Sequence, residues 1–253
     1  MNRILTAAVL IPLVLYAIFG SLTWLLPTIV ALFAAICFYE YANIAKGFGM
    51  DVPAIGGIIA GLPLIIITRE HMIVLLAISL GALAWQMRVS ALQQVLPRAA
   101  GLSFGLLYIF GSWKCGLMLS QVNPWWLLFA VGINWVGDIS AYYAGRNFGK
   151  RKLAPVISPG KTWEGAIASL VICVVCGVFY FQRFLPQVPL VEVLLVSAFV
   201  NIVGQLGDLA ESALKRGAGV KDSGSILPGH GGFLDRIDST LFTMPAVYLY
   251  LQL

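Results

Sequence analysis

Apolar residues run almost without interruption along this 253-residue chain, and short polar segments divide them into about nine stretches. Lipid offers no hydrogen bonds to a bare backbone, so a membrane-crossing segment is typically a helix of about 20 mostly apolar residues. The pattern therefore predicts about nine transmembrane helices. Their expected ranges are 4–22, 24–45, 53–68, 71–87, 99–120, 123–144, 163–185, 189–211 and 237–253.

The composition agrees with this pattern. Apolar residues make up 60% of the chain and charged residues only 11%, whereas about a quarter of a soluble domain is charged. These fractions exclude a soluble enzyme and a disordered chain, and four cysteines are too few for a disulfide scaffold. We expect an all-α integral membrane protein, a polytopic bundle forming a single domain over 1–253. Polar residues gather in the second half, about 123–253, where we expect the catalytic chemistry.

The basic residues indicate an orientation. Thirteen of the sixteen Lys and Arg residues lie in the N-terminus and in alternate connections between the spans, whereas only Arg69 and Arg183 lie in the other connections. Cytoplasmic loops carry such an excess of positive charge. We therefore expect a multi-pass protein of the cell inner membrane, with a cytoplasmic N-terminus, cytoplasmic loops at 145–162 and 212–236, and an outer C-terminus.

Two of the predicted spans carry stripes of polar residues, which are costly at membrane depth and often functional. One stripe, at i, i+4 and i+8, consists of Asn134, Asp138 and Tyr142. The other consists of Asn201, Gln205, Asp208 and Ser212, with Glu211 beside it. Hydrogen bonds between helices are the alternative explanation for each stripe.

The two long polar loops differ in charge. The loop 145–162 carries five basic residues, with Ser158 and Lys161 near its end, and it could bind phosphate or only set the topology. The loop 212–236 mixes both signs, and this mixture favours a phosphate site that uses a metal ion. Its charged residues, with the acid that follows it, are Lys215, Arg216, Lys221, Asp222, Asp235, Arg236 and Asp238. Acids at a helix start are also favourable without a metal.

The stretch 212–238 resembles the signature of the phosphatidate cytidylyltransferases, also called CDP-diacylglycerol synthases. The matching residues are Ser212, Lys215, Arg216, Lys221, Asp222, His230, Gly231, Gly232, Asp235, Arg236 and Asp238. An upstream run is similar too, from Asp138 and Ala141-Tyr142 through Gly145, Gly149-Lys150, Ser158-Pro159 and Lys161-Thr162 to Glu164-Gly165.

The resemblance implies an enzyme that joins CTP and phosphatidic acid to give CDP-diacylglycerol and pyrophosphate. It implies Mg²⁺, with room for a second metal ion. We expect Asp208 and Asp235 to ligate metal, with Asp238 and Glu211 as further candidates. We expect Lys161, Lys215 and Arg216 to take part in catalysis. The expected substrate-binding residues are Ser158, Ser212, Lys221, Asp222, His230, Arg236, Asp138 and Tyr142.

Beyond CTP, phosphatidic acid and the bilayer, we expect no nucleic-acid partner. The pairs Gly57-x-x-x-Gly61 and Gly101-x-x-x-Gly105 would allow close helix packing within one subunit or in a homodimer. A membrane transporter would also need polar groups inside its spans, and it is kept as an alternative. A related nucleotidyl- or phosphotransferase acting on another lipid phosphate is the second alternative.

Overall fold

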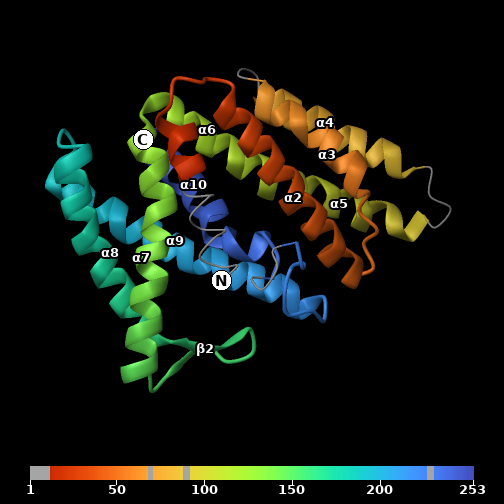
Figure 1. Ribbon diagram of the computed structural model, residues 1–253. Coiled ribbons are helices and arrows are strands. Elements are labelled where there is room, and N and C mark those ends of the chain that lie inside the picture. The colour runs from red at the N-terminus through yellow and green to blue at the C-terminus, as the bar shows by residue number, and fades with distance from the viewer. Residues whose placement is uncertain (1–11, 68–70, 88–91, 227–230) are drawn as a thin grey trace. The chain divides into compact units, whose positions relative to one another are not determined.

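The structure, a computed structural model, describes residues 12–67, 71–87, 92–226 and 231–253. These residues form helices almost throughout, so the expected all-α fold class is confirmed (Figure 1). The helices before the polar hairpin are α2 (Leu25–Gly47), α3 (Ala54–Ile66), α4 (His71–Gln86), η1 (Leu92–Gln94), α5 (Val95–Gly105), η2 (Leu106–Gly111), α6 (Ser112–Val122) and α7 (Pro124–Phe148). The remaining elements are β1 (Lys152–Ala154), β2 (Ser158–Thr162), α8 (Trp163–Phe184), α9 (Leu190–Gly217), η3 (Leu234–Arg236) and α10 (Asp238–Tyr250).

Four helices of the described chain are long and apolar enough to cross a membrane: α2, the continuous helix Leu92–Val122, α8 and α9. The chain is therefore a multi-pass membrane protein. The start of the predicted span 4–22, residues 4–11, lies outside the described residues, and 12–19 are helical. Helices α3 and α10 have 13 residues each, short of the ~20 that a span needs. Nine crossings stay a prediction.

The chain divides into two compact units, and both are assembled from separate segments. The first comprises 1–117 and 214–236, and the second comprises 118–213 and 237–253. The predicted catalytic half, 123–253, is thus shared between them, because the loop 214–236 packs with the first part of the chain. Helix α9 is continuous and contributes residues to both units.

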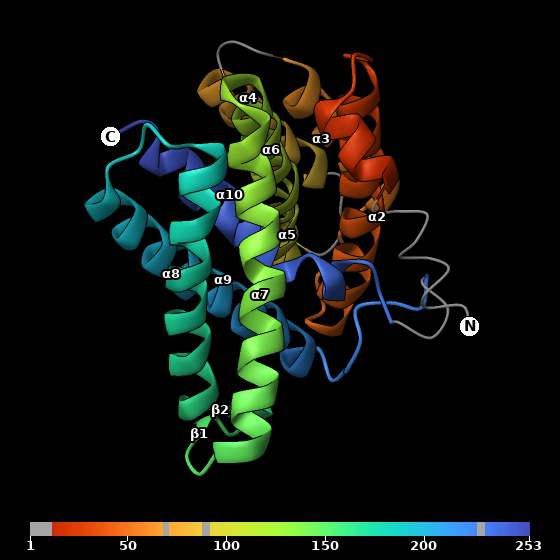
Figure 2. The same ribbon diagram turned by 60° about the vertical axis from the view of Figure 1, so that its left-hand side comes forward.

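In the first unit, α2, α3, α4 and α5 pack as neighbours (Figures 1 and 2). The two predicted glycine pairs provide the close contacts. A Cβ atom at Gly57 would overlap the Phe38 ring, and one at Gly61 would overlap the Phe110 ring. Gly105 faces the Tyr41 ring in the same way. The glycines therefore act within the subunit, and the homodimer stays a prediction.

In the second unit, α7 and α8 run side by side (Figure 2). Helix α7 begins where the Asn123 side chain accepts a hydrogen bond from Trp125 N, with Pro124 in the first turn. Asn134 joins α7 to α10, because its amide donates to Thr243 Oγ1 at 3.0 Å and to Thr240 Oγ1 at 3.3 Å. Asn134 thus joins two helices by hydrogen bonds, which is the alternative explanation given above for the stripe of Asn134, Asp138 and Tyr142.

Candidate active site

A β-hairpin connects α7 to α8, where the sequence indicates only a basic loop. Strands β1 and β2 pair antiparallel, with Lys152 opposite Thr162 and Ala154 opposite Ser158. The end of the hairpin is fixed to the start of α8. The Thr162 hydroxyl accepts a hydrogen bond from Gly165 N at 3.1 Å, and the Glu164 carboxylate accepts one from Arg151 N at 3.2 Å. The cap and this acid hold β2 in place above the first turn of the helix.

Glycines let the end of α7 approach the hairpin and α8. A Cβ atom at Gly165 would lie 2.8 Å from the carbonyl oxygen of Ala141, and one at Gly145 would lie 3.0 Å from Thr162 Oγ1. A Cβ at Gly149 would lie 2.8 Å from Thr162 Cγ2. Larger residues at these positions would force the backbones apart. The glycines of the upstream motif therefore have a packing role.

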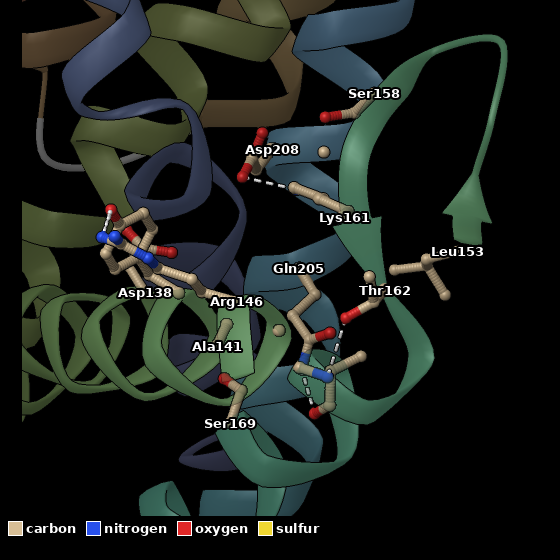
Figure 3. A pocket seen from close by; sticks show the side chains of 15 residues that line it. Asp138, Ala141, Arg146, Leu153, Ser158, Lys161, Thr162, Ser169, Gln205 and Asp208 are labelled. Atoms are coloured by element: carbon tan, nitrogen blue, oxygen red, sulfur yellow. Dashed lines mark hydrogen bonds and ion pairs between the residues drawn. The ribbon is translucent and has the colours of Figure 1, made fainter. Parts of the chain in front are cut away.

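A pocket of about 440 Å³ opens beside this junction, entirely within the second unit (Figure 3). It brings together five of the residues expected to bind metal or substrate or to take part in catalysis: Asp138, Tyr142, Ser158, Lys161 and Asp208. They come from α7, β2 and α9, so the two polar stripes do face one space. Gln205 of the second stripe also lines the pocket, and its amide donates to Ala166 O at 3.3 Å.

A charged pair lies in this pocket. Lys161 Nζ is 2.5 Å from Asp208 Oδ2, and both side chains are 27% exposed. The Ser212 hydroxyl donates to Asp208 Oδ1 at 3.4 Å. Arg146, which lines the same pocket, donates to the Tyr142 hydroxyl at 3.1 Å. The pocket therefore offers two cations, two carboxylates and several hydroxyl groups.

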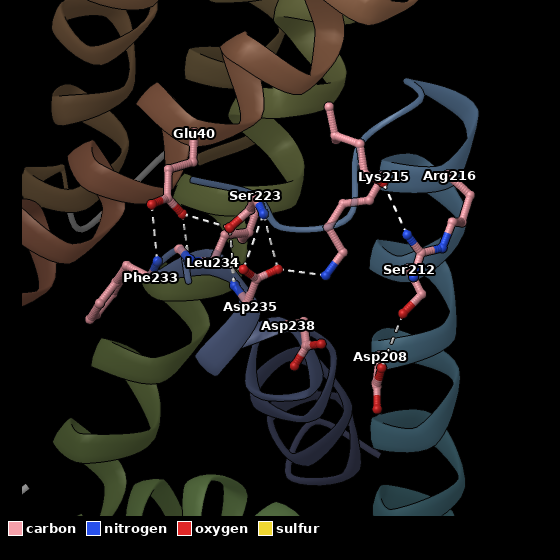
Figure 4. A network of polar contacts seen from close by, with 12 residues as sticks. Glu40, Asp208, Ser212, Lys215, Arg216, Ser223, Phe233, Leu234, Asp235 and Asp238 are labelled. Atoms are coloured by element: carbon pink, nitrogen blue, oxygen red, sulfur yellow. Dashed lines mark hydrogen bonds and ion pairs between the residues drawn. The ribbon is translucent and has the colours of Figure 1, made fainter. Parts of the chain in front are cut away.

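A second polar cluster lies in the first unit, around Asp235 (Figure 4). Lys215 Nζ donates to Asp235 Oδ1 at 2.5 Å, and both side chains are 11% exposed. The backbone N–H groups of Ser223 and Gly232 donate to Asp235 Oδ2 at 3.0 and 2.9 Å. Burial acts to raise the Asp235 pKa, but the bonds from Lys215, Gly232 and Ser223 outweigh it and hold the pKa below the usual range.

Other predicted residues of the loop lie at the surface. The exposed residues are Lys221, Asp222, Arg216 and Arg236, and Arg216 donates to Val220 O at 3.2 Å.

The remaining expected residues lie elsewhere. Asp238 stands at the start of α10, where its carboxylate accepts from Ser239 N at 2.6 Å. Glu211 is completely buried. His230 lies outside the described residues.

Residues 1–253 match the cytidylyltransferase family. The chain belongs to that family. Its relatives include proteins named phosphatidate cytidylyltransferase from Pseudomonas aeruginosa, 36% identical over 96% of this chain and 94% of that protein, and from Bacillus subtilis, 49% identical over 53% of this chain and 50% of that protein. A third, from Staphylococcus haemolyticus, is 42% identical over 62% of this chain and 57% of that protein. The Bacillus and Staphylococcus matches thus cover little more than half of those proteins.

The resemblance stated from the motifs is confirmed by the family match, and the transporter alternative gains no support from it. For a cytidylyltransferase that uses Mg²⁺, the carboxylates of the pocket fit as ligands. Asp138 and Asp208 line one space and interact electrostatically with Lys161, and hard carboxylate oxygens suit Mg²⁺.

Asp235 fits a metal less well in this conformation. A carboxylate has about four lone-pair sites, and Lys215, Gly232 and Ser223 occupy both Asp235 oxygens. Within the described residues, no group of three or more His, Cys, Asp or Glu side chains gathers around one point. Asp208 and Asp235 also lie in different units. Their sharing of one ion stays a prediction.

The sequence indicated no role for three contributors. Arg146 and Thr162 line the pocket. Arg146 added only to the charge of the loop 145–162, and Thr162 entered only as part of the upstream motif. Glu40 belongs to the first unit and is 1% exposed. A carboxylate inside the apolar segment 24–45 was itself a signal, by the rule that ionisable groups at membrane depth are often functional.

Proposed function

We propose that this cytidylyltransferase transfers a cytidylyl group from CTP to phosphatidic acid. The observation that carries the proposal is the pocket of the second unit, where Lys161, Arg146 and Asp208 meet at the end of apolar helices. Such a pocket suits a phosphorylated substrate that meets a lipid headgroup. The names of the relatives support this choice of substrates.

In the reaction, an oxygen of the lipid phosphate attacks the α-phosphorus of CTP. The new P–O bond gives CDP-diacylglycerol, and the bond between the α-phosphorus and the bridging oxygen breaks and releases pyrophosphate. The lipid phosphate is already an anion, so no side chain needs to remove a proton from it. Repulsion between two anions is the main barrier, and positioned cations lower it.

Lys161 and Arg146 are the cations that the pocket offers for phosphate oxygens. Lys215, Arg216, Lys221 and Arg236 are the proposed phosphate contacts of the first unit. Ser158 and Ser212 serve as hydrogen-bond donors, and Asp222, Tyr142 and His230 remain substrate-binding candidates. Asp138 and Asp208 would hold Mg²⁺, with Asp235, Asp238 and Glu211 as further candidates. When bound, the ion supplies positive charge against the phosphates.

We further propose that the protein lies in the cell inner membrane with the hairpin β1–β2 on the cytoplasmic side. The excess of Lys and Arg in the loops 145–162 and 212–236 supports this orientation. CTP is soluble and phosphatidic acid lies in the leaflet, so a pocket near the cytoplasmic surface is accessible to both substrates.

The test uses the purified protein in detergent with CTP labelled at the α-phosphorus, phosphatidic acid and Mg²⁺. We expect the label to pass into a lipid product that co-migrates with CDP-diacylglycerol, and unlabelled pyrophosphate to appear in equal amount. EDTA should stop the reaction and added Mg²⁺ should restore it. Label transfer only to a different lipid phosphate would assign another substrate. If the protein reconstituted into liposomes accumulates label inside them without a lipid product, it is a transporter.

A further inference from the structure

Glu40 lies deep in the apolar helix α2. Its side chain is 1% exposed, and its neighbours along the helix are almost all apolar. Burying a carboxylate is costly unless its oxygens are hydrogen-bonded. The partners of Glu40 therefore indicate what the acid does.

Within the part of the chain that the structure describes, three hydrogen bonds to Glu40 come from one distant loop (Figure 4). The Ser223 hydroxyl donates to Oε2 at 2.9 Å, Leu234 N donates to the same atom at 2.8 Å, and Phe233 N donates to Oε1 at 3.0 Å. Serine 223 and the 233–234 peptide stand at opposite ends of the segment 223–234. One carboxylate thus gathers both ends of the loop.

The loop is shaped to fit this acid. A Cβ atom at Gly224 would lie 2.5 Å from Glu40 Oε1, and one at Gly232 would lie 2.7 Å from Oε2. Only glycine lets the backbone come so close at both places. The Phe233 ring also packs on the Phe33 ring of α2, with centroids 4.7 Å apart. The contact is therefore a fitted interface between α2 and the loop.

Ser223 links Glu40 to the lysine of the second polar cluster. While its hydroxyl donates to Glu40, its backbone N–H donates to Asp235 Oδ2 at 3.0 Å. Asp235 in turn accepts from Lys215 at 2.5 Å. Glu40, Ser223, Asp235 and Lys215 thus form one chain of hydrogen bonds within the first unit.

We propose that Glu40 is a positioning residue, which holds Ser223 and the 233–234 peptide so that Asp235 directs Lys215 toward the phosphates of CTP. The proposal rests on the proposed function for its substrate. It gives the apolar first part of the chain an indirect part in nucleotide binding, through the position of Lys215. A residue with a merely structural role would satisfy the buried N–H groups and leave CTP binding unaffected.

The first experiment separates the two roles by kinetics. In Glu40→Gln, an NH₂ group replaces one carboxylate oxygen and faces an N–H or O–H donor. The loop therefore loses at least one of its hydrogen bonds to α2. We expect the KM for CTP to rise about tenfold, because one hydrogen bond to a charged group corresponds to about that factor. The KM for phosphatidic acid should stay within twofold.

Tyr41→Phe is the matched control. Tyr41 adjoins Glu40 on α2 and is buried, and its hydroxyl donates to Gly101 O at 2.8 Å, away from the loop. We expect both KM values of this variant to stay within twofold of the wild type. Equal changes of both KM values in Glu40→Gln, or no change, would overturn the proposal. Glu40→Asp keeps the carboxylate and should recover part of the loss.

Should Glu40→Gln fail to fold, Ser223→Ala tests the same chain. It removes the hydroxyl between the two acids and leaves Glu40 its two backbone donors. We expect a rise in the KM for CTP again. Where both variants fold, their effects should be less than additive, because both break the same chain. Fully additive effects of the two substitutions, or an unchanged KM for CTP in Ser223→Ala, would contradict the proposed role of Glu40.

Hydrogen exchange tests the loop without any substrate. We expect the amides of Phe233 and Leu234 to exchange at least about tenfold faster in Glu40→Gln and at the wild-type rate in Tyr41→Phe. Unchanged exchange in Glu40→Gln would refute the hold on the loop. If the wild type forms no CDP-diacylglycerol, the proposed function fails, while this exchange measurement still decides whether Glu40 holds the loop.

Discussion

Lys161 Nζ lies 2.5 Å from Asp208 Oδ2, so a proposed metal ligand already holds a proposed phosphate-binding cation. The first unit repeats the relationship, since Asp235 holds Lys215 at the same distance. A phosphate that binds either lysine competes with the carboxylate for it. Substrate binding would therefore exchange one ionic partner for another in each unit.

The first prediction concerns Asp208. Asp208→Asn should lower turnover by at least about a hundredfold, because removing an electrostatic contact to the reacting groups costs about that much. Its effect on stability should be less than about 1 kcal/mol, because the pair with Lys161 is partly exposed. Label transfer from CTP and thermal unfolding in detergent measure the two effects.

Asp51→Asn is the control for this substitution. The Asp51 side chain is 67% exposed, its Oδ2 lies 4.0 Å from Arg98 Nη2, and Asp51 does not line the pocket. Its activity and stability should match the wild type. If Asp208→Asn instead loses stability and activity in parallel, Asp208 has a structural role.

The second prediction concerns Lys215. Lys215→Ala should raise the KM for CTP by about tenfold or more, because a charge-assisted contact to phosphate is lost. The preference among phosphatidic acids of different acyl length should not change. Lys46→Ala is the control, since Lys46 of α2 is exposed and its Nζ donates to Asn43 Oδ1 at 3.3 Å. An altered acyl preference with an unchanged KM for CTP would place Lys215 at the lipid.

The third prediction concerns Asp235. Asp235→Asn should nearly abolish turnover, because an amide cannot accept all the bonds from Lys215, Ser223 and Gly232. The Mg²⁺ concentration for half-maximal activity should stay unchanged if Asp235 acts by holding Lys215. A large increase in that concentration would make Asp235 a metal ligand after all, and near-normal activity would exclude both roles.

The fourth prediction concerns the close approach of α7 and α8. Gly165→Ala should reduce stability by about 1–3 kcal/mol, the usual cost of overpacking, because the new Cβ would lie 2.8 Å from Ala141 O. Activity should fall as well, since Gly165 lines the pocket. Gly132→Ala on α7 is the control, because nothing lies within 4 Å of its added Cβ. Equal unfolding midpoints for the two variants would show that the packing adapts.

The fifth prediction concerns orientation. Val156, in the hairpin turn, is 87% exposed, and Gln187 is exposed beyond the other end of α8. With the native cysteines replaced, a membrane-impermeant thiol reagent added to whole cells should label Gln187→Cys and not Val156→Cys. Permeabilising the cells should allow the reagent to label Val156→Cys. The reverse pattern in intact cells would invert the proposed topology.

The helical, membrane-embedded nature of the protein and its family were both predictable from the sequence. Lipid imposes long apolar helices, and that demand appears in the apolar stretches that the polar segments separate. The signature from Ser212 to Asp238 has fixed local spacings, so it could be recognised without a fold. Asp138, Tyr142 and Asp208 could be selected because polar side chains are unusual in apolar helices.

The partners of these residues depended on the tertiary structure. The β-hairpin forms because Arg151, Thr162 and Glu164 meet at the start of α8, and the local sequence of glycine, proline and lysine does not encode that pairing. Glu40 binds residues more than 180 positions away. The sequence by itself therefore determined that the protein lies in a membrane, that it is helical, and to which enzyme family its motifs belong, because these properties follow from local composition and local spacing. Only the folded backbone decided which acid holds which lysine, because those contacts join segments that are distant in the sequence.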